Sequence, residues 1–166
     1  MTKKCLMALL LAVVSLGAKA QFEKGTNYLN TSLTGLDMSY SKYTKFRMGL
    51  EVKDGYFVED SWMLYGRLGY NHQSLTGPNL NSFELGAGVR YYFKPTGVFL
   101  SGGLLYEHER SGGFRHNNID IATEAGYCFY VNHYLSIEPA IYYNLCMNHF
   151  SDGSKIGLKL GLGFYF

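Results

Sequence analysis

Hydrophobic and polar residues alternate along most of the chain after its first twenty residues. The alternation is clearest at the C-terminal end, where every second residue is apolar: Ile156, Leu158, Leu160, Leu162, Phe164 and Phe166. Successive side chains of an extended strand point to opposite faces, so a period of two predicts β-strands that each have one apolar face. The pattern therefore predicts an all-β fold.

About eight segments carry this alternation, and most of them are about ten to thirteen residues long. They lie near residues 26–36, 45–57, 62–71, 82–93, 98–108, 118–131, 134–146 and 155–166. Strands of soluble domains usually have about five or six residues, whereas a tilted strand that crosses a bilayer needs about 9–11. The segment lengths therefore favour strands that cross a membrane.

The connections between the segments alternate in length. Short turns at 58–61, 94–97 and 131–133 interleave with longer polar connections at 37–44, 72–81, 109–117 and 147–154. Outer-membrane barrels have short turns on the periplasmic side and longer loops outside. The sequence thus predicts an eight-stranded antiparallel up-and-down transmembrane β-barrel with both termini at the short-turn side.

The first twenty residues differ from the rest of the chain. Lys3 and Lys4 precede an apolar stretch over 6–14, and Ala18-Lys19-Ala20 matches the small-residue end of a secretory signal peptide. We therefore predict a cleaved signal peptide at 1–20 and a barrel domain at 21–166. The Cys128 and Cys146 thiols would then enter an oxidising compartment, but their expected positions along the strands are too far apart for a disulfide.

Charged residues share the polar parity of the segments, and they balance. The six cations are Arg47, Lys53, Arg67, Arg90, Lys155 and Lys159, and the six anions are Glu51, Glu84, Glu107, Asp120, Glu124 and Glu138. Many glycines lie on the same parity, where small residues would make room for long ones inside a narrow barrel. We predict a charge network in the lumen, with Arg67 and Glu84 as its first pair. The alternative is a soluble barrel with these charges in water and the apolar parity inside.

Two further features bear on this prediction. Aromatic residues gather beside the short turns, as Tyr and Trp do at the boundary between membrane and water. Pro139 falls inside the seventh segment, where it removes a donor from the strand ladder, so we expect a local irregularity there.

Composition narrows the class of protein. The chain has 166 residues, of which 16% are aromatic and 17% are charged, and its formal net charge is +2. This composition is unlike that of disordered chains, and the small charge argues against a nucleic-acid partner. Past residue 20 no uncharged apolar run approaches the roughly 18 residues of a membrane-spanning helix.

The signal peptide, the eight alternating segments and the terminal phenylalanine together resemble the small outer-membrane barrels of the OmpA and OmpX type. Val89-Arg90-Tyr91-Tyr92-Phe93 and Ile137-Glu138-Pro139 are similar to porin-family, "outer membrane protein beta-barrel domain" sequences common in Bacteroidetes. The resemblance implies a Gram-negative outer-membrane location, a monomer, and contact with outer-membrane lipid and lipopolysaccharide. It also implies a C-terminal signal for the barrel assembly machinery, carried by Leu158, Leu160, Leu162, Phe164 and Phe166.

The sequence offers few candidate catalytic or metal-binding residues. His72 with Ser74, and His108 with Ser111 and Glu107 or Glu109, could form a base and hydroxyl pair, as lipid-modifying barrels need. His72, His108, His116 and His149 could converge on a metal ion. Neither set has a diagnostic spacing, so we predict no catalytic, metal or cofactor site.

The predicted role is structural or surface-interacting, in the manner of an adhesion protein, rather than that of an open diffusion porin. The connections at 72–81, 109–117 and 147–154 would form the contact surface. The alternatives are a lipid-modifying enzyme, a narrow pore and a soluble periplasmic ligand-binding barrel.

Overall fold

The computed structural model describes residues 22–34, 44–75, 80–111, 114–147 and 154–166, with the backbone alone at 44–47, 74–75, 111 and 114. The predicted signal peptide at 1–20 lies outside these residues. No helix among the described residues has the length and apolarity to cross a membrane.

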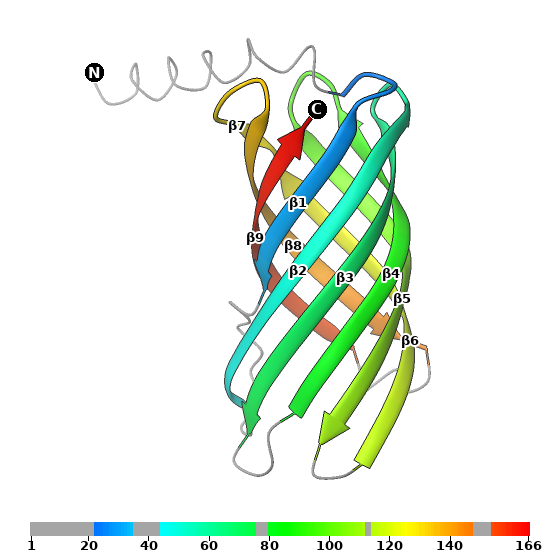
Figure 1. Ribbon diagram of the computed structural model, residues 1–166, viewed down its shortest axis with the longest axis vertical. Helices are drawn as coiled ribbons and strands as arrows, with labels where there is room; N and C mark the ends of the chain where they lie inside the picture. The colour runs from blue at the N-terminus through cyan, green and yellow to red at the C-terminus, as the bar shows by residue number, and fades with distance from the viewer. Residues whose placement is uncertain (1–21, 35–43, 76–79, 112–113, 148–153) are drawn as a thin grey trace, which may run out of the picture.

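The chain forms one closed antiparallel β-barrel (Figure 1). Its strands are β1 (Asn27–Thr34), β2 (Thr44–Glu59), β3 (Trp62–Leu75), β4 (Leu80–Phe93), β5 (Val98–Ser111), β6 (Phe114–Tyr127), β7 (Phe129–Tyr130), β8 (Leu135–Cys146) and β9 (Lys155–Tyr165). Each strand pairs with the next along the chain, except that β6 does not pair with β7; β1 pairs with β9, and β6 pairs with β8 to complete the wall. Because β6 and β7 form one interrupted strand, the wall of the barrel has eight strands. This confirms the predicted fold class.

The interruption between β6 and β7 lies opposite Pro139. The β6 ladder ends at the pair Gly126 and Ala140, and the β7 ladder resumes at Phe129 and Ile137 in the same register. Pro139 has no N–H to donate, so the ladder is broken without an inserted residue. The predicted irregularity is therefore a gap in hydrogen bonding rather than a bulge.

The predicted connections at 72–81 and 109–117 are wrong, because most of those residues belong to strands. β3 continues to Leu75 and β4 begins at Leu80, while β5 and β6 approach each other as far as Ser111 and Phe114. The apolar alternation stops near 71 and 108, but backbone pairing does not need apolar side chains and continues past it. Gly112-Gly113, a pair typical of two-residue hairpin turns, was the overlooked sequence signal.

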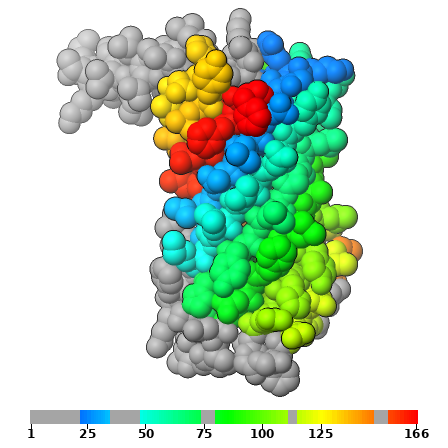
Figure 2. Space-filling view, viewed as in Figure 1, coloured from blue at the N-terminus to red at the C-terminus, as the bar shows by residue number. Residues whose placement is uncertain are grey.

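The two faces of the wall are chemically opposite. Large apolar side chains of alternate residues point outward, with Leu104 62% exposed and Leu68 51% exposed, whereas the Arg90 side chain on the inner face is 1% exposed. Figure 2 shows the outward side chains as adjacent bands that follow the tilt of the strands. This is the facing of a membrane barrel and the reverse of a soluble barrel.

Candidate functional site

The middle of the barrel interior holds eight charged side chains, which we call the central ion cluster. Each is at most 7% exposed, and together they carry four positive and four negative charges: Lys53, Arg67, Arg90, Lys159, Glu51, Glu84, Glu124 and Glu138. They project from strands all around the wall because alternate residues of every strand face inward. An isolated buried charge costs several kcal/mol, roughly, so equal numbers suit an enclosed site.

Glu124 contacts three of the four cations of this cluster. Its Oε2 accepts hydrogen bonds from the ammonium groups of Lys53, at 2.6 Å, and Lys159, at 2.8 Å. Its Oε1 accepts from the Arg90 guanidinium at 2.8 Å. Three cations from three different strands thus share one carboxylate.

Glu51 and Glu84 extend the cluster away from Glu124. Glu51 lies 3.1 Å from the Lys159 ammonium and 3.4 Å from the Arg67 guanidinium. Arg67 also donates to Glu84 Oε2 at 2.7 Å, which is the pair expected from the sequence. The two are not directly opposite, since Arg67 faces Gly86 and Glu84 faces Gly69 across the β3–β4 ladder. The glycines leave room for the long side chains to cross diagonally.

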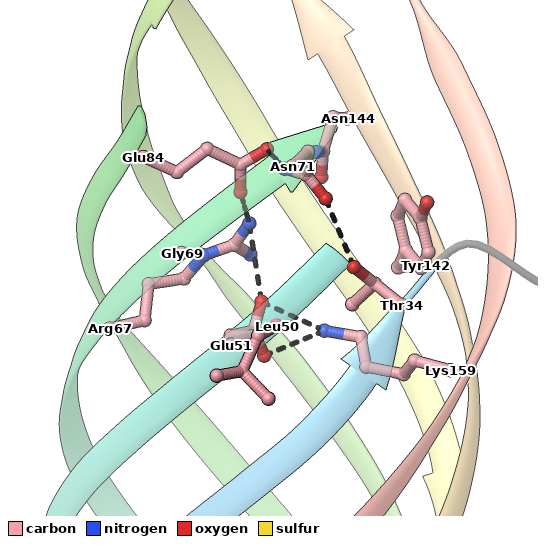
Figure 3. A pocket seen from close by; sticks show the side chains of 10 residues that line it. All are labelled: Thr34, Leu50, Glu51, Arg67, Gly69, Asn71, Glu84, Tyr142, Asn144 and Lys159. Atoms are coloured by element: carbon pink, nitrogen blue, oxygen red, sulfur yellow. Dashed lines mark hydrogen bonds and ion pairs between the residues drawn. The ribbon is translucent and has the colours of Figure 1, made fainter. Parts of the chain in front are cut away.

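A small cavity adjoins this part of the cluster. Its volume is about 10 Å³, roughly enough for one water molecule. Figure 3 shows Arg67 between Glu84 and Glu51, with Lys159 reaching Glu51 from β9 and Asn71 beside Thr34. Thr34 donates to Asn71 at 3.0 Å, and Asn71 donates to Glu84 at 2.6 Å. Neutral side chains thus continue the network toward the far end of the barrel, which is the end away from the short turns.

Nearer the far end, away from the short turns, a second ionic group surrounds Lys155. Its ammonium donates to Glu107 at 2.7 Å and to Glu109 at 3.0 Å. Glu109 was not among the residues predicted for the lumen. Its side chain shares the inward parity of Glu107, two residues before it on β5, so the strand period alone could have placed it there.

Of the remaining two predicted residues, Asp120 joins no ion pair among the described residues, and the side chain of Arg47 is not described. Asp120 points inward and is 1% exposed, and neither of its carboxylate oxygens has a hydrogen-bond partner among the described residues. The residues directly opposite Asp120, which are Leu105 on β5 and Cys146 on β8, carry no positive charge. Arg47 belongs to β2, and its side chain lies outside the described residues.

The short-turn end of the interior is filled by aromatic rings. Phe22, which precedes β1, is fully buried and stacks on Tyr92 with a centroid distance of 4.1 Å. The ring of Phe22 also contacts the rings of Phe57, Tyr130 and Tyr165. The prediction from sequence missed Phe22, although an aromatic residue just after the predicted cleavage site was an available signal.

Arg90 connects the aromatic and ionic parts of the interior. The carbon at the centre of its guanidinium lies 4.1 Å from the Phe99 ring centroid, within the range of a cation–π contact. The guanidinium also donates to Glu138 at 3.0 Å and to the Tyr28 hydroxyl at 2.9 Å. Planar stacking and forked donation are both properties of Arg rather than Lys.

We expect Phe22→Ala to destabilise the barrel by about 3 kcal/mol, since Phe-to-Ala changes in packed cores cost about 3–5 kcal/mol. The reason is the loss of ring contacts at the short-turn end together with the cavity left behind. Reversible urea unfolding in phospholipid vesicles measures the change. Glu23→Ala, at the exposed neighbouring position, is the control, and equal stability of both variants would contradict the role of Phe22.

The inward-facing glycines lie where a larger side chain would not fit, which allows a second prediction. A Cβ atom at Gly86 would lie 2.8 Å from the Leu104 carbonyl oxygen and 3.0 Å from Cγ of Arg67, whereas a Cβ at outward-facing Gly66 would meet nothing within 4 Å. We expect Gly86→Leu to lose at least about 1–3 kcal/mol by overpacking, and Gly66→Leu to lose none. The folded fraction of each variant, from unheated SDS gels, tests this, and equal folded fractions would contradict it.

The two cysteines of the barrel are buried free thiols. Cys128 lies between β6 and β7, with its sulfur 3.3 Å from the Tyr165 hydroxyl, and Cys146 ends β8. The structure therefore contains no disulfide between them, as expected from their separation along the strands.

The residues considered for catalysis do not come together in the described part of the chain. His108 faces outward and bonds Asn117, whereas Glu107 and Glu109 face inward to Lys155. His72 bonds Asn81. Side chains of Ser74 and Ser111, and the whole of His149, lie outside the described residues. Among those that are described, no group of three or more His, Cys, Asp or Glu residues is placed to hold a metal ion.

The residues predicted to form the C-terminal assembly signal lie on one face of the last strand. Each is exposed on the outside of the barrel: Leu158, Leu160, Leu162, Phe164 and Phe166. β9 pairs with β8 on one side and β1 on the other, so it closes the barrel. An outward apolar row on the closing strand is accessible to the barrel assembly machinery. Recognition of this row during assembly stays a prediction.

Comparison with known proteins identifies the fold. No family model matches the chain, and no curated protein sequence matches it. Among solved structures, the N-terminal β-barrel domain of Pseudomonas aeruginosa OprF has 18% identity and a TM-score of 0.58, covering 86% of this chain and 98% of that one. The outer membrane protein Ail of Yersinia pestis has 17% identity and a TM-score of 0.60, covering 86% and 100%. Neisserial surface protein A has 15% identity and a TM-score of 0.57, covering 85% and 96%. These likenesses show the fold of small outer-membrane barrels.

Proposed function

We propose that this chain is a monomeric outer-membrane barrel with a lumen closed by its own side chains, and that its role is structural or surface-interacting. The observation that carries the proposal is the buried, charge-balanced central ion cluster, whose adjoining cavity is about 10 Å³. A barrel of eight strands encloses a space that side chains can fill. An ion crossing it would have to displace several buried ion pairs.

The outer face supports the membrane location. Its exposed apolar side chains run along every long strand, and on β5 they extend from Val98 to Tyr106. Eight residue steps along a strand span about 26 Å, which at a tilt of about 40° gives a height of about 20 Å, most of the apolar band of about 25 Å in outer-membrane barrels. Export by the predicted signal peptide and insertion by the barrel assembly machinery belong to the same proposal, as does the resemblance to Bacteroidetes sequences.

The orientation in the membrane follows from the connections that remain after the strands are defined. At the far end, the connections at 35–43 and 147–154 are longer than the turns at 60–61, 94–97 and 131–134, whereas those at 76–79 and 112–113 are as short as these turns. We therefore place the short-turn end, which also holds Phe166, in the periplasm. Ail of Yersinia pestis is an attachment invasion locus protein, and an adhesion-like role here would use the longer connections.

Two measurements on purified protein test the proposal. The unheated protein in detergent should migrate on SDS gels at a different apparent mass from the boiled protein, because a folded barrel resists unfolding by SDS. Planar bilayers containing the protein should show no steady conductance steps. Identical migration with and without boiling would refute the barrel in detergent, and a stable open conductance would refute the closed lumen.

The enzyme alternative has its own test. Lipid A from cells that express the protein should have the same mass as lipid A from cells that do not, since His72 and His108 each bond an asparagine rather than a hydroxyl or a carboxylate. A mass shift equal to one acyl chain would replace our proposal with a lipid-modifying activity.

A further inference from the structure

The outward face of β3 to β6 changes its chemistry near the far end of the barrel. The last apolar outward residues of these strands are Tyr70, Phe83, Tyr106 and Ile119. The next outward positions are polar, and beyond them come two arginines. We call these polar and cationic residues the rim: His72, Asn81, His108, Asn117, Arg110 and Arg115.

The histidines of the rim are held by cross-strand hydrogen bonds. Nδ1 of His72 lies 2.6 Å from Asn81 Oδ1 across the β3–β4 hairpin, and Nδ1 of His108 lies 2.6 Å from Asn117 Oδ1 across the β5–β6 hairpin. The two pairs have the same geometry in two successive hairpins. They form an ordered polar border directly beside the last aromatic side chains of the apolar face.

Arg110 and Arg115 stand directly opposite each other in the β5–β6 ladder, and both are exposed. Like charges in this position destabilise a strand pair. Neither guanidinium has a hydrogen bond or an ion pair within the described part of the chain. Among the described residues, the pair is therefore an exposed double positive charge without a counter-charge.

The acidic residues of the same strands cannot compensate the arginines, because all of them point into the barrel. Between residues 62 and 127 they are Glu84, Glu107, Glu109, Asp120 and Glu124. Glu109 is the neighbour of Arg110, yet it binds Lys155 in the interior. A compensating anion for the arginine pair must come from outside these strands.

A surface groove leads from the apolar face to this charge. Its volume is about 360 Å³, and its lining passes from the rings of Tyr70 and Phe83 to the side chains of His108 and Arg110. One end is thus apolar and aromatic, and the other is cationic. A molecule that fits both ends has a hydrocarbon part and an anionic head.

We propose that the rim binds the phosphate group of a lipid in the outer leaflet, with Arg110 and Arg115 donating to the phosphate and the groove receiving the adjoining part of the lipid. The proposal rests on the membrane location proposed above and specifies which surface contacts which lipid chemistry. Guanidinium groups match phosphate oxygens with paired hydrogen bonds. The rim lies where the apolar face ends, which is the level of lipid headgroups.

The test uses the full protein folded in phosphatidylcholine nanodiscs and titrated with lipid A or with dephosphorylated lipid A, with bound lipid counted by native mass spectrometry. The parent should bind lipid A and should bind the dephosphorylated form much more weakly. The double variant Arg110→Gln, Arg115→Gln should bind lipid A about tenfold more weakly or worse, the effect expected for losing hydrogen bonds to a charged group. The matched control, Lys24→Gln with Lys94→Gln, removes two cations at the short-turn end and should bind as the parent does.

Each contrary outcome is distinct. Equal binding by the parent and the arginine variant, or equal binding of the two lipids, would overturn the proposal. Competition by millimolar inorganic phosphate or by a sulfated oligosaccharide would also overturn it, because the site would then take a soluble anion rather than a lipid. Failure of the parent to insert into nanodiscs or to show heat-modifiable migration would instead refute the proposed function.

Discussion

Glu124→Gln should destabilise the barrel by about 3–5 kcal/mol, the usual cost of removing one partner from a buried ion pair. The variant leaves four cations facing three carboxylates in the central ion cluster, because Glu124 neutralises Lys53, Arg90 and Lys159 together. The cavity of about 10 Å³ lies beside Glu51 and Arg67 and is not lined by Glu124, so it offers no space for water to replace the lost carboxylate. Reversible denaturation in phospholipid vesicles measures the loss.

A double variant and an exposed ion pair serve as controls for this result. Lys53→Met combined with Glu124→Gln restores charge balance and should recover more than half of the lost stability, which a double-mutant cycle would report as coupling. Glu59→Gln breaks a pair of similar length, 2.8 Å, between Lys24 and Glu59, whose side chains are both more than 60% exposed. The hydrogen bond to Glu59 raises the pKa of Lys24, but solvent screens the pair, so no measurable change is expected. A Glu124 variant as stable as its parent would show that water reaches the cluster.

Leu104→Lys should cost about 2–4 kcal/mol, which is the penalty for a cation at mid-bilayer depth on the outside of a barrel. Leu104 is 62% exposed on the outer face and lies within the apolar run of β5. Its ammonium would face hydrocarbon with no partner along the outer face of the neighbouring strands, where Ala87 and Ile121 stand opposite it. Folding into vesicles of defined lipid measures the change.

The control for this result lies on the same strand. Val98→Lys places the same charge at the short-turn end of β5, where an ammonium reaches water and the cost falls to about 0–1 kcal/mol. Equal stability of the two variants would mean that the outer face is not buried in lipid. The membrane location would then fail, while the closed barrel itself would stand.

The predicted strands were accurate where the alternation of apolar residues marks them and inaccurate where it stops. Outward positions 72 and 110 are polar, so the periodic signal ended early and these residues were assigned to loops, although the strands continue. Pro139 was recognised as an irregular position because its missing N–H is a local property. The backbone ladder, by contrast, depends on partners that are distant in the sequence.

The interior shows a similar division. Parity alone placed the twelve charged residues on one face, and ten of the eleven whose side chains are described join ion pairs. Parity could not show that Asp120 would face Leu105 and Cys146, or that Phe22 would cover the aromatic end of the lumen. Glu109 has the right parity but was counted as part of a loop.

The amino-acid sequence by itself determined the number of strands, their antiparallel order and the chemistry of each face, because the side-chain period of a strand is a local geometric property. The tertiary structure decided which charges meet, which carboxylate in the described interior has no cation beside it, and where two arginines face each other with no counter-charge among the described residues. Those contacts depend on the register and closure of the barrel, which bring together residues as far apart as Glu51 and Lys159. Register is a collective property of all the strand pairs. It is therefore defined only by the closed barrel and not by any single segment of the sequence.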